Sequence, residues 1–404
     1  MQKHRTWVEV NERALKQNID TLKSMLEGEA RFCAVLKANA YGHGLIETAQ
    51  IVGRAGVDAF AVDMIDDALL LREKFPTALI IVLGYTMFDR IDDAITHNIH
   101  LTMYDKEGIR AAESAAKKHA KKINLHIKIE TGTLRQGVLA EDLEDLFVEI
   151  KRSTHINVSG VSTHFANIED SSNPQYATMQ FGRFQETIAC IRDMGYNPEH
   201  IHCACSAAII LYPDTHGTLV RAGISMYGIW SSDLVRDTVR TQYIRCDLQP
   251  VLTWKTRIAQ IKSVTMGTPI GYGLTEVMKR SGRIAIIPVG YWDGYDRKLS
   301  SIGEVLVKGY RCKIVGRVCM NMCMVDVSSV PGVEKEDEVV LIGKVGRHQV
   351  SAEHLAKWTR TISYEILARI NPNIPRIVTP GIQHGKEESF QERGSKELPL
   401  QKSE

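Results

Sequence analysis

Residues 33–44, with the sequence CAVLKANAYGHG, decide between the two folds that this chain could adopt. Four apolar residues lead into Lys37, and a turn of small residues and glycines follows. A short buried strand that ends in such a turn begins a β/α unit of a parallel sheet. An open, doubly wound sheet usually carries the pattern G-x-G-x-x-G after its first strand. This turn lacks that pattern, so the stretch favours a closed barrel.

Seven further apolar runs continue the pattern along the chain. Eight short buried strands that alternate with helices within about 210 residues predict an α/β fold, an N-terminal (β/α)8 barrel of the TIM type. The runs are residues 33–37, 59–62, 79–83, 100–104, 125–130, 158–164, 201–205 and 219–221. Amphipathic stretches with helical periodicity lie between them, among them 45–54, 105–119, 141–151 and 175–194.

The sequence changes in character after residue 239. Strand-like runs separated by glycine pairs and VPG dominate, and a pair of helical patterns at 352–358 and 362–369 closes the region. This texture predicts a second, mainly antiparallel β-domain at the C-terminus. The expected strands are residues 252–261, 284–289, 305–307, 312–315, 322–327 and 339–342.

These changes in texture give the expected domain boundaries. We expect the barrel to occupy residues 11–239, and the β-domain to combine residues 1–10 with residues 240–380. The segment 381–404 is polar and charged, which predicts a disordered tail.

Composition excludes several classes of function. The chain is 44% hydrophobic and 24% charged, with a net charge of +2, so no strong field draws it to nucleic acid or to an anionic membrane. We expect no secretory signal, because no apolar run follows the basic residues 1–10, and the most apolar stretch, residues 78–83, is far shorter than the roughly 20 residues of a membrane span. The eight scattered cysteines lack paired Cys-x-x-Cys spacing. We expect a cytoplasmic protein with reduced thiols and no metal site.

Polar residues follow the predicted barrel strands. In a barrel of this type, reactive groups lie at the C-terminal ends of the strands. The sequence therefore predicts that one face of the barrel gathers a lysine, two arginines, a histidine and a tyrosine, together with small or glycine-rich turns. These residues are Lys37, Tyr41, Arg135, His164 and Arg221.

Lys37 is the candidate nucleophile of this face. Burial of its stem after the apolar run should lower the pKa of its amine and free it to attack an aldehyde. A lysine that reaches solvent from a strand end is the plainer alternative. Ser206 and Gly223 follow the last two strands, where such barrels usually bind phosphate. These phosphate donors favour the nucleophile over the surface lysine.

Eight motifs stand in one order over roughly residues 5–380. They are AVLKANAYGHG, HIKIETGTLRQG, STHFA, CSAA, RAGISMYG, GYG, VGYWDGY and VGRVCMNMCMVDV. In that order they resemble the motifs of alanine racemases, enzymes with an N-terminal barrel and a C-terminal β-domain that use pyridoxal 5′-phosphate (PLP). The resemblance implies interconversion of L-alanine and D-alanine, which supplies D-alanine for peptidoglycan.

The resemblance also implies two catalytic bases. Lys37 matches the lysine that holds PLP as a Schiff base and acts on one face of the substrate Cα. Tyr272 matches the tyrosine that acts on the opposite face and comes from the partner subunit, which implies a homodimer with shared active sites. Arg221 matches the arginine that faces the pyridine nitrogen. His164 matches the histidine that links this arginine to the tyrosine.

Further positions match the binding residues of the family. Arg135 matches an arginine near the cofactor's phenolic oxygen and the substrate carboxylate. The backbone of Met320 matches a carboxylate donor, and Tyr291 matches a residue at the substrate entry. Lys128 stands where many members carry a carbamylated lysine. The positions that match phosphate-binding residues are Tyr41, Ser206, Gly223, Ile224 and Tyr364.

This chemistry explains why such residues are needed. Racemisation removes the Cα proton and returns a proton to the other face, so two bases on opposite faces give inversion. A free tyrosine has a pKa of about 10 and is a poor base at neutral pH, unless nearby positive charge favours its phenolate. Arg221 would supply that charge through His164. A guanidinium with a pKa above about 12 would also leave the pyridine nitrogen unprotonated and so limit side reactions.

Taken singly, the residues leave plainer interpretations open. His164 could cap a layer of the barrel. Arg135 could form a surface ion pair with Glu130, which would contribute little. The three tyrosines could be core or turn residues of the β-domain: Tyr272, Tyr291 and Tyr364.

The chain departs from the usual alanine racemase pattern at four places. ETGTLRQG stands where DTGMGRLG is typical, RAGIS replaces RPGIS, CSAA replaces NSAA, and Asn321 stands where aspartate is common. These changes surround the carboxylate and side-chain end of the pocket. Serine, or a broader set of amino acids, is therefore an alternative substrate.

Two other functional classes share this barrel. A non-catalytic PLP-binding protein would lack the β-domain and its opposite-face tyrosine, and residues 240–380 argue against that class. A decarboxylase would need an acidic partner for the pyridine nitrogen, and Arg221 has the opposite charge.

Overall fold

Eight parallel strands form the N-terminal part of the computed structural model, which describes residues 4–380. Their order is β8-β7-β6-β5-β4-β3-β2-β9. The backbone N–H of Arg221 in β9 donates to the carbonyl of Ala204, 3.0 Å away and just beyond β8, which brings the two ends of the sheet together. The strands are β2 (Arg31–Val35), β3 (Ala59–Val62), β4 (Leu79–Val82), β5 (His100–Met103), β6 (Ile123–Lys128), β7 (Ile156–Ser162), β8 (His200–His202) and β9 (Leu219–Ala222).

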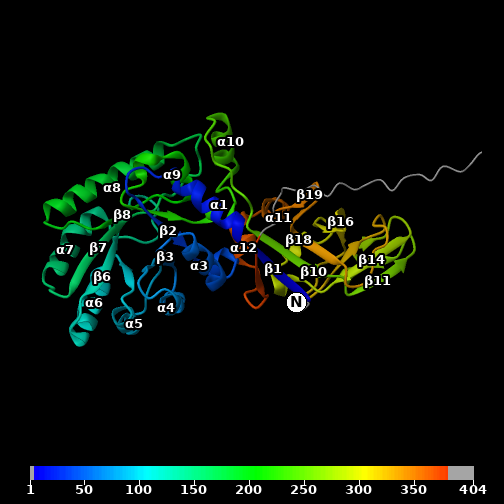
Figure 1. Ribbon diagram of the computed structural model, residues 1–404, viewed down its shortest axis with the longest axis horizontal. Helices are drawn as coiled ribbons and strands as arrows, with labels where there is room; N and C mark the ends of the chain where they lie inside the picture. Colours follow the sequence, from blue (N-terminus) through cyan, green and yellow to red (C-terminus); the bar gives the residue numbers. More distant parts are fainter. Residues whose placement is uncertain (1–3, 381–404) are drawn as a thin grey trace, which may run out of the picture.

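Burial on both faces explains the composition of these strands. All four residues of β3 (AFAV) and of β4 (LIIV) are buried, as expected for a parallel sheet covered by helices. The helices surround the barrel in Figure 1. Their buried residues recur at helical spacing, as Leu15, Ile19 and Leu22 do in α1. They are α1 (Glu12–Lys23), α3 (Leu45–Arg54), α4 (Ile65–Lys74), α5 (Ile91–Thr96), α6 (Lys106–His119), α7 (Leu143–Lys151), α8 (Gln175–Asp193), α9 (Ser206–Leu211) and α10 (Asp233–Thr241).

A mostly antiparallel sheet forms the other end of the molecule (Figure 1). Its order is β11-β14-β17-β16-β15-β18-β10-β1-β20, and β19 pairs with β18. The one parallel pair on this path joins β1 to β20. The strands are β1 (Thr6–Asn11), β10 (Leu252–Arg257), β11 (Gln260–Val264), β14 (Gly282–Ile287), β15 (Glu304–Val307), β16 (Tyr310–Val315), β17 (Cys323–Asp326), β18 (Glu338–Val345), β19 (His348–Val350) and β20 (Arg376–Thr379).

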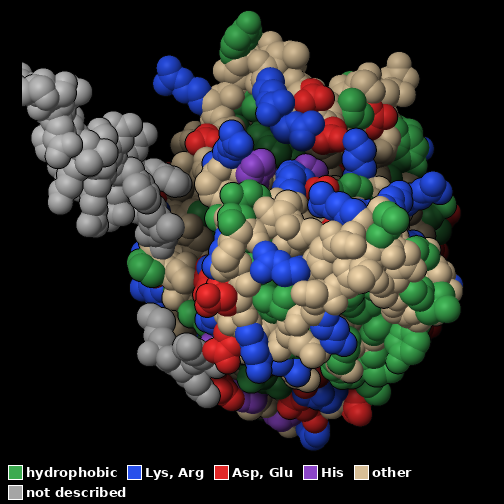
Figure 2. Space-filling model, turned by 90° about the vertical axis from the view of Figure 1, so that its right-hand side faces the viewer, with side chains coloured by type: hydrophobic (Ala, Val, Ile, Leu, Met, Phe, Trp, Pro, Cys, Tyr) green, Lys and Arg blue, Asp and Glu red, His purple; other side chains and the backbone are tan. Residues whose placement is uncertain are grey.

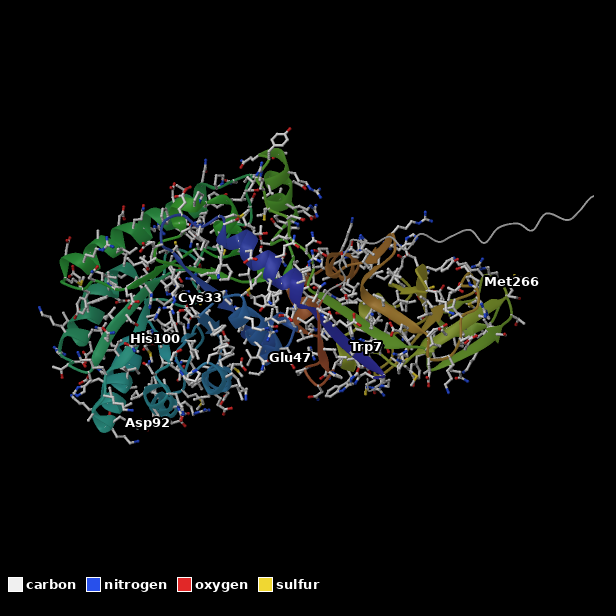
Figure 3. All side chains as sticks on the ribbon, viewed as in Figure 1. Trp7, Cys33, Glu47, Asp92, His100 and Met266 are labelled. Carbon is white, nitrogen blue, oxygen red and sulfur yellow. The ribbon has the colours of Figure 1, made fainter. Side chains whose placement is uncertain are left out.

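Short elements complete this part and carry several predicted site residues. They are a two-stranded sheet of β12 (Pro269–Ile270) and β13 (Glu276–Val277), the 3-10 turns η5 (Tyr272–Leu274) and η6 (Tyr291–Asp293), and the helices α11 (Ala352–Thr359) and α12 (Ser363–Ala368). Two further short elements lie at the barrel strand ends: α2 (Lys37–Tyr41) and η4 (Ile224–Tyr227). Figure 3 places Cys33 and His100 in the barrel, Trp7 in the C-terminal sheet, and Met266 in the turn that follows β11 at the far end of the molecule.

The predicted fold class, a (β/α)8 barrel followed by a mainly antiparallel β-domain, is confirmed. One predicted strand is wrong in detail. The run 252–261 contains two strands, because β10 pairs with β1 and β18 whereas β11 pairs with β14 at the far edge of the sheet. The predicted tail at 381–404 lies outside the described residues. Within residues 4–380, no helix has the length and apolarity to cross a membrane.

Candidate functional site

Lys37 lies directly after β2 and begins an unusual turn. Ala38, Asn39, Ala40 and Tyr41 have φ angles of 54°, 55°, 52° and 52°, so four consecutive residues other than glycine are left-handed. This conformation costs an L-residue roughly 1–2 kcal/mol. Such strain persists only where the surrounding structure imposes it, and it is concentrated at functional sites.

The amine of Lys37 lies in an environment that favours its neutral form. Burial lowers its pKa, Asp63 opposes that shift, and Arg135 and Arg221 lower the pKa further. A neutral amine is the nucleophilic form of lysine. The structure thus gives Lys37 the property expected from the sequence, and it brings both predicted arginines into the electrostatic environment of this lysine.

Arg221 is 5% exposed and is held without a carboxylate partner among the described residues. Its Nη1 donates to Nδ1 and to the carbonyl oxygen of His202, at 2.5 and 2.8 Å. Its Nη2 donates to the carbonyl of Thr163 at 2.8 Å and to Nδ1 of His164 at 3.3 Å. Within residues 4–380 these bonds use the Nη atoms and leave Nε–H without a partner. Burial lowers the pKa of Arg221.

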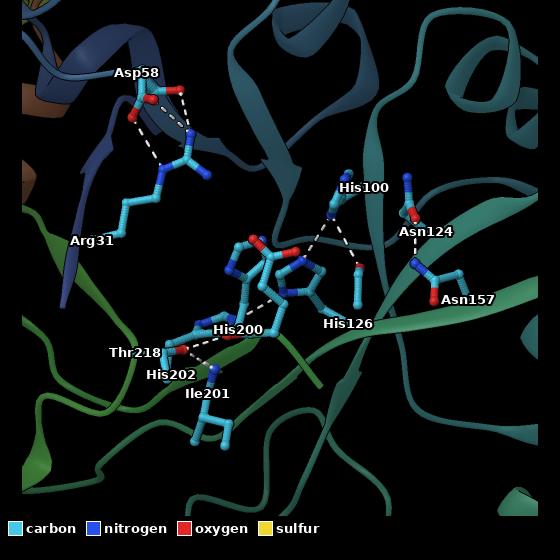
Figure 4. A network of polar contacts seen from close by, with 12 residues as sticks. Arg31, Asp58, His100, Asn124, His126, Asn157, His200, Ile201, His202 and Thr218 are labelled. Carbon is cyan, nitrogen blue, oxygen red and sulfur yellow. Dashed lines mark hydrogen bonds and ion pairs between the residues drawn. The ribbon is translucent and has the colours of Figure 1, made fainter. Parts of the chain in front are cut away.

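A chain of histidines continues from Arg221 through the barrel, and Figure 4 shows its members His202, His126 and His100. Because a guanidinium only donates, His202 must accept at Nδ1 and carry its proton on Nε2. His126 then accepts at Nδ1, 2.8 Å from that nitrogen, and carries its own proton on Nε2. His100 accepts this proton at Nδ1 over 3.1 Å, and Ser159 Oγ lies at the same distance from that atom. Every ring in the chain is therefore neutral, with one fixed tautomer.

Burial agrees with that assignment. Desolvation lowers the pKa of His100 to about 3 and lowers the pKa values of His126 and His202 well below 6.5, and nearby cationic groups lower them further. Arg221 is thus hydrogen bonded to a chain of neutral side chains, and no acidic group in the described structure cancels its positive charge.

His164 lies just after β7 and occupies the other side of Arg221. It accepts from Arg221 at Nδ1, which places its proton on Nε2. Burial lowers its pKa well below 6.5, and Arg221 and Lys128 lower it further. His164 is therefore a neutral donor through Nε2, and its place beside Arg221 favours the predicted link over a layer-capping role.

Ser206, Gly223 and Tyr41 form a cradle at the ends of β8 and β9. Ser206 Oγ accepts from the backbone N–H groups of Gly223 and Ser225, at 3.1 and 3.3 Å. A Cβ on Gly223 would lie 2.8 Å from Tyr41 Oη, so only glycine keeps this space open. The hydroxyl of Ser225 is buried without a hydrogen-bond partner in the described structure. Such an orphaned donor beside backbone N–H groups suits an anion such as phosphate.

Two tyrosines and Ile224 border the cradle. The rings of Tyr41 and Tyr364 lie 6.1 Å apart, which joins the barrel turn to α12 of the C-terminal part. Burial raises the pKa values of both phenols, so both remain protonated donors. Ile224 begins η4, directly after Gly223. The five predicted phosphate-binding residues therefore lie in one region.

Lys128 is the last residue of β6, and Arg135 lies in the loop that follows this strand. Burial lowers the pKa of Lys128 far below 10.5, and Arg221 and Arg135 lower it further. The neutral amine that results is the form needed to make a carbamate. Glu130 accepts the backbone N–H groups of Gly132, Thr133 and Arg135 instead of pairing with the guanidinium of Arg135. The surface ion pair considered from the sequence is therefore wrong.

Three predicted residues lie in the C-terminal part, where no hydrogen bond or ring contact among residues 4–380 joins them to Lys37. Tyr272, Tyr291 and Met320 are 72%, 42% and 56% exposed. The segments that carry Tyr291 and Met320 are hydrogen bonded to each other. The backbone N–H of Tyr291 donates to the carbonyl of Cys319, the neighbour of Met320, at 3.0 Å. A single chain thus brings together the predicted barrel residues and Tyr364. Among the described residues, it shows no contact of this kind between Tyr272, the predicted second base, and Lys37.

Sequence reasoning missed several residues of this site. Asp63 follows the run 59–62, so the rule of strand ends would have found it. Ser225 lies within RAGISMYG, two residues beyond Gly223. His202 and His126 lie within strands, and nothing in their sequence neighbourhood indicates a chain that connects strands 76 residues apart.

Comparison with known proteins identifies the family. The model described as "Alanine racemase, N-terminal domain" matches residues 10–231, and "Alanine racemase, C-terminal domain" matches residues 251–378. An alanine racemase of Leptospira interrogans is 38% identical over 376 residues, which are 92% of this chain and 95% of the relative. An alanine racemase structure from Clostridium difficile 630 has a TM-score of 0.87 and 33% identity, covering 94% of this chain and 97% of that one.

A racemase with another substrate has a similar structure. The histidine racemase of Leuconostoc mesenteroides has a TM-score of 0.84 and 28% identity, covering 94% of this chain and 99% of that one. Both family models match in order, and together they span most of the described residues. With the barrel, the β-domain and the arrangement around Lys37, these matches show that the chain belongs to the alanine racemase family.

Proposed function

We propose that this protein is a PLP-dependent alanine racemase that supplies D-alanine for peptidoglycan. The observation that carries the proposal is the environment of Lys37: its amine feels the charge of Arg221, a cation without an acidic partner, and the turn that it begins carries Tyr41 into the anion cradle of Ser206 and Gly223. A phosphate-bearing aldehyde needs this combination of a neutral amine and a site for phosphate. Ser206, Gly223, Ile224, Tyr41 and Tyr364 would hold the phosphate, and Arg221 Nε would face the ring nitrogen.

The residues of the chain would move protons at two faces of the substrate Cα. PLP, when bound, supplies the electron withdrawal that makes the Cα proton acidic. Lys37 Nζ takes the proton from one face, while the hydroxyl of Tyr272 gives a proton to the other, and the roles reverse for the opposite enantiomer. His164 donates through Nε2 to the phenolate and stabilises it. Arg135 and the backbone of Met320 would bind the substrate carboxylate, with Tyr291 at the entry.

Arg221 would also restrict the chemistry. Its guanidinium has no proton to give to the ring nitrogen at neutral pH, and His202 and His126 offer none, since the Nε2 proton of each is used in a hydrogen bond within the chain. The ring nitrogen would therefore stay unprotonated, which weakens electron withdrawal and favours proton return over side reactions.

A homodimer would complete each site. The C-terminal part carries several exposed apolar side chains besides Tyr272: Leu274, two residues away, is 65% exposed, and Met320 is 56% exposed. Figure 2 looks onto the C-terminal sheet and shows hydrophobic side chains among charges of both signs on this face. Exposed apolar surface of this kind is typical of an interface. We propose that Tyr272 of one subunit lies opposite Lys37 of the other.

Three finer assignments accompany this proposal. We propose the domain boundaries given above, with residues 11–239 as the PLP-binding barrel. Eight cysteines that are all unpaired suit a reducing cytoplasm. Alanine is the proposed substrate because both the relative from Leptospira interrogans and the structure from Clostridium difficile 630 are named alanine racemases. A histidine racemase has a similar structure, so the substrates must be compared directly.

Exchange at Cα tests the function. L-alanine, serine, lysine, arginine and histidine are incubated singly with the PLP-loaded protein in heavy water, and deuterium at Cα and optical rotation are followed. We expect deuterium incorporation with loss of rotation, fastest for alanine, and no release of CO2. Faster exchange with another amino acid would reassign the substrate. A PLP-loaded protein that exchanges none of them would be a carrier, and CO2 release would indicate a decarboxylase.

A further inference from the structure

We propose that Arg376 of the C-terminal sheet is a positioning residue for the cofactor site, because it locks the left-handed turn that follows Lys37. The inference rests on the proposed PLP site. Arg376 touches neither the substrate nor the reacting atoms, and it acts through the carbonyl of Gly42. Arg376 lies outside the eight motifs, 334 residues beyond that glycine, so no sequence pattern links the two residues.

The guanidinium of Arg376 is satisfied entirely by backbone carbonyls. Its Nε and Nη2 both donate to the carbonyl of Gly42, at 3.0 and 2.9 Å. Its Nη1 donates to the carbonyls of Asn371 and Ile374 at 2.7 and 2.6 Å, and Nη2 also lies 3.2 Å from that of Ile370. No carboxylate pairs with it within residues 4–380. A forked, fixed set of donors is what allows one side chain to fasten two segments at once.

The turn needs such fastening because its conformation is unfavourable. Within it, the carbonyl of Asn39 accepts from Gly44 N–H at 3.0 Å, and the Asn39 side chain accepts from Leu45 N–H at 2.8 Å. His43 Nδ1 lies 3.1 and 2.9 Å from the carbonyls of Ala40 and Tyr41. These contacts are local. Among the hydrogen bonds within residues 4–380, the carbonyl of Gly42 is the one in this turn that accepts from the C-terminal part, through Arg376.

The second segment held by Arg376 leads back to the cradle. Residues 370–374 follow α12, which carries Tyr364, whereas Gly42 ends the turn that carries Tyr41. A Cβ on Gly42 would lie 2.0 Å from the carbonyl of Leu367 in α12, so the two segments are in direct contact. Arg376 therefore fixes the two proposed phosphate-binding tyrosines relative to each other and to Lys37. Figure 3 labels Glu47 of α3, the helix that follows this turn, between the barrel and the C-terminal sheet.

The chain supplies a matched control in Arg72. Like Arg376, this arginine of α4 makes five hydrogen bonds to backbone carbonyls, in its case those of Phe75, Pro76, Ala78, His97 and Asn98, at 2.7–3.0 Å. The segments that it fastens precede β4 and β5, at the opposite end of the barrel from Lys37. Replacing it removes the same kind and number of hydrogen bonds without touching the turn.

The experiment compares Arg376→Met, Arg376→Lys and Arg72→Met with the wild type. Two quantities are measured: the dissociation constant of PLP from the reconstituted protein, and hydrogen exchange of residues 38–44 in the PLP-free protein. For Arg376→Met we expect PLP affinity to fall about tenfold or more, the loss that corresponds to one or two hydrogen bonds to a charged group, and exchange in the turn to accelerate. In Arg376→Lys the single ammonium group can still donate to some of these carbonyls, so PLP affinity and the protection of the turn from exchange should each be partly recovered.

Arg72→Met separates positioning from general destabilisation. We expect it to lower the melting temperature about as much as Arg376→Met, while PLP affinity and exchange in the turn stay at the wild-type values. Equal effects of the two Met variants on PLP affinity would overturn the proposal, as would unchanged affinity or exchange in Arg376→Met. If that variant does not fold, Arg376→Lys decides on the same two readouts. A wild-type protein that binds no PLP would refute the proposed function instead, and the exchange result would still stand.

Discussion

His126 is the residue through which the histidine chain can be tested. Replacing His126 with Leu places an apolar side chain of similar size in a fully buried position and removes the acceptor of the His202 Nε2–H group. His100 keeps a possible donor, because Ser159 Oγ lies 3.1 Å from its Nδ1. One donor is thus left orphaned, which costs roughly 1–3 kcal/mol of unfolding free energy. His126→Asn retains an acceptor close to the former Nδ1 position and should lose clearly less.

Two measurements decide this prediction. Nitrogen-15 NMR of histidine-labelled protein should show His202 and His126 as neutral rings protonated at Nε2. Denaturant unfolding should place the variants in the order wild type, His126→Asn, His126→Leu. A wild-type spectrum with His202 protonated at Nδ1, or equal stability of the two variants, would refute the assigned histidine tautomers. It would also refute the conclusion that Arg221 is a cation held only by neutral side chains.

Three further predictions follow from the site. Gly223→Ala should weaken PLP binding by about tenfold or more, because its Cβ would lie 2.8 Å from Tyr41 Oη, and equilibrium dialysis with unchanged affinity would contradict the cradle. Acid should unfold the protein: between about pH 6.5 and pH 3 the unfolded chain binds a proton at His100 that the folded chain does not, so stability should fall by about 1.4 kcal/mol per pH unit for each such ring. A flat stability profile from pH 7 to pH 4 would argue against neutral buried histidines. Arg221→Glu should raise the release of pyruvate from alanine, measured with a coupled dehydrogenase, and no rise would show that Arg221 does not limit side reactions.

Much of the fold follows from local patterns. The barrel strands are short and buried on both faces, so each appears in the sequence as a compact apolar run, as in LIIV of β4. Residues at strand ends follow from the same pattern, which is why Lys37, His164 and Arg221 were predicted to share a face. The family resemblance supplied the roles of Tyr272 and Tyr364, which no periodicity indicates.

Other features depend on tertiary contacts that no local pattern encodes. The left-handed turn contains two alanines, which prefer the right-handed helix, and contacts such as that of Arg376 impose its conformation. The histidine chain joins residues that are 26 and 76 positions apart. Splitting the run 252–261 into two strands likewise depends on which partners pair with each half.

The central claim is that Lys37 and Tyr272 act together across a subunit interface, and mixing two inactive variants tests it most directly. Lys37→Ala and Tyr272→Phe are each purified, dissociated together and allowed to reassociate with PLP. Half of the randomly formed dimers would be hybrids with one intact site of two, so alanine racemisation should recover to about a quarter of the wild-type rate. A mixture as inactive as its two components, although hybrids are present by mass, would contradict the shared two-base site.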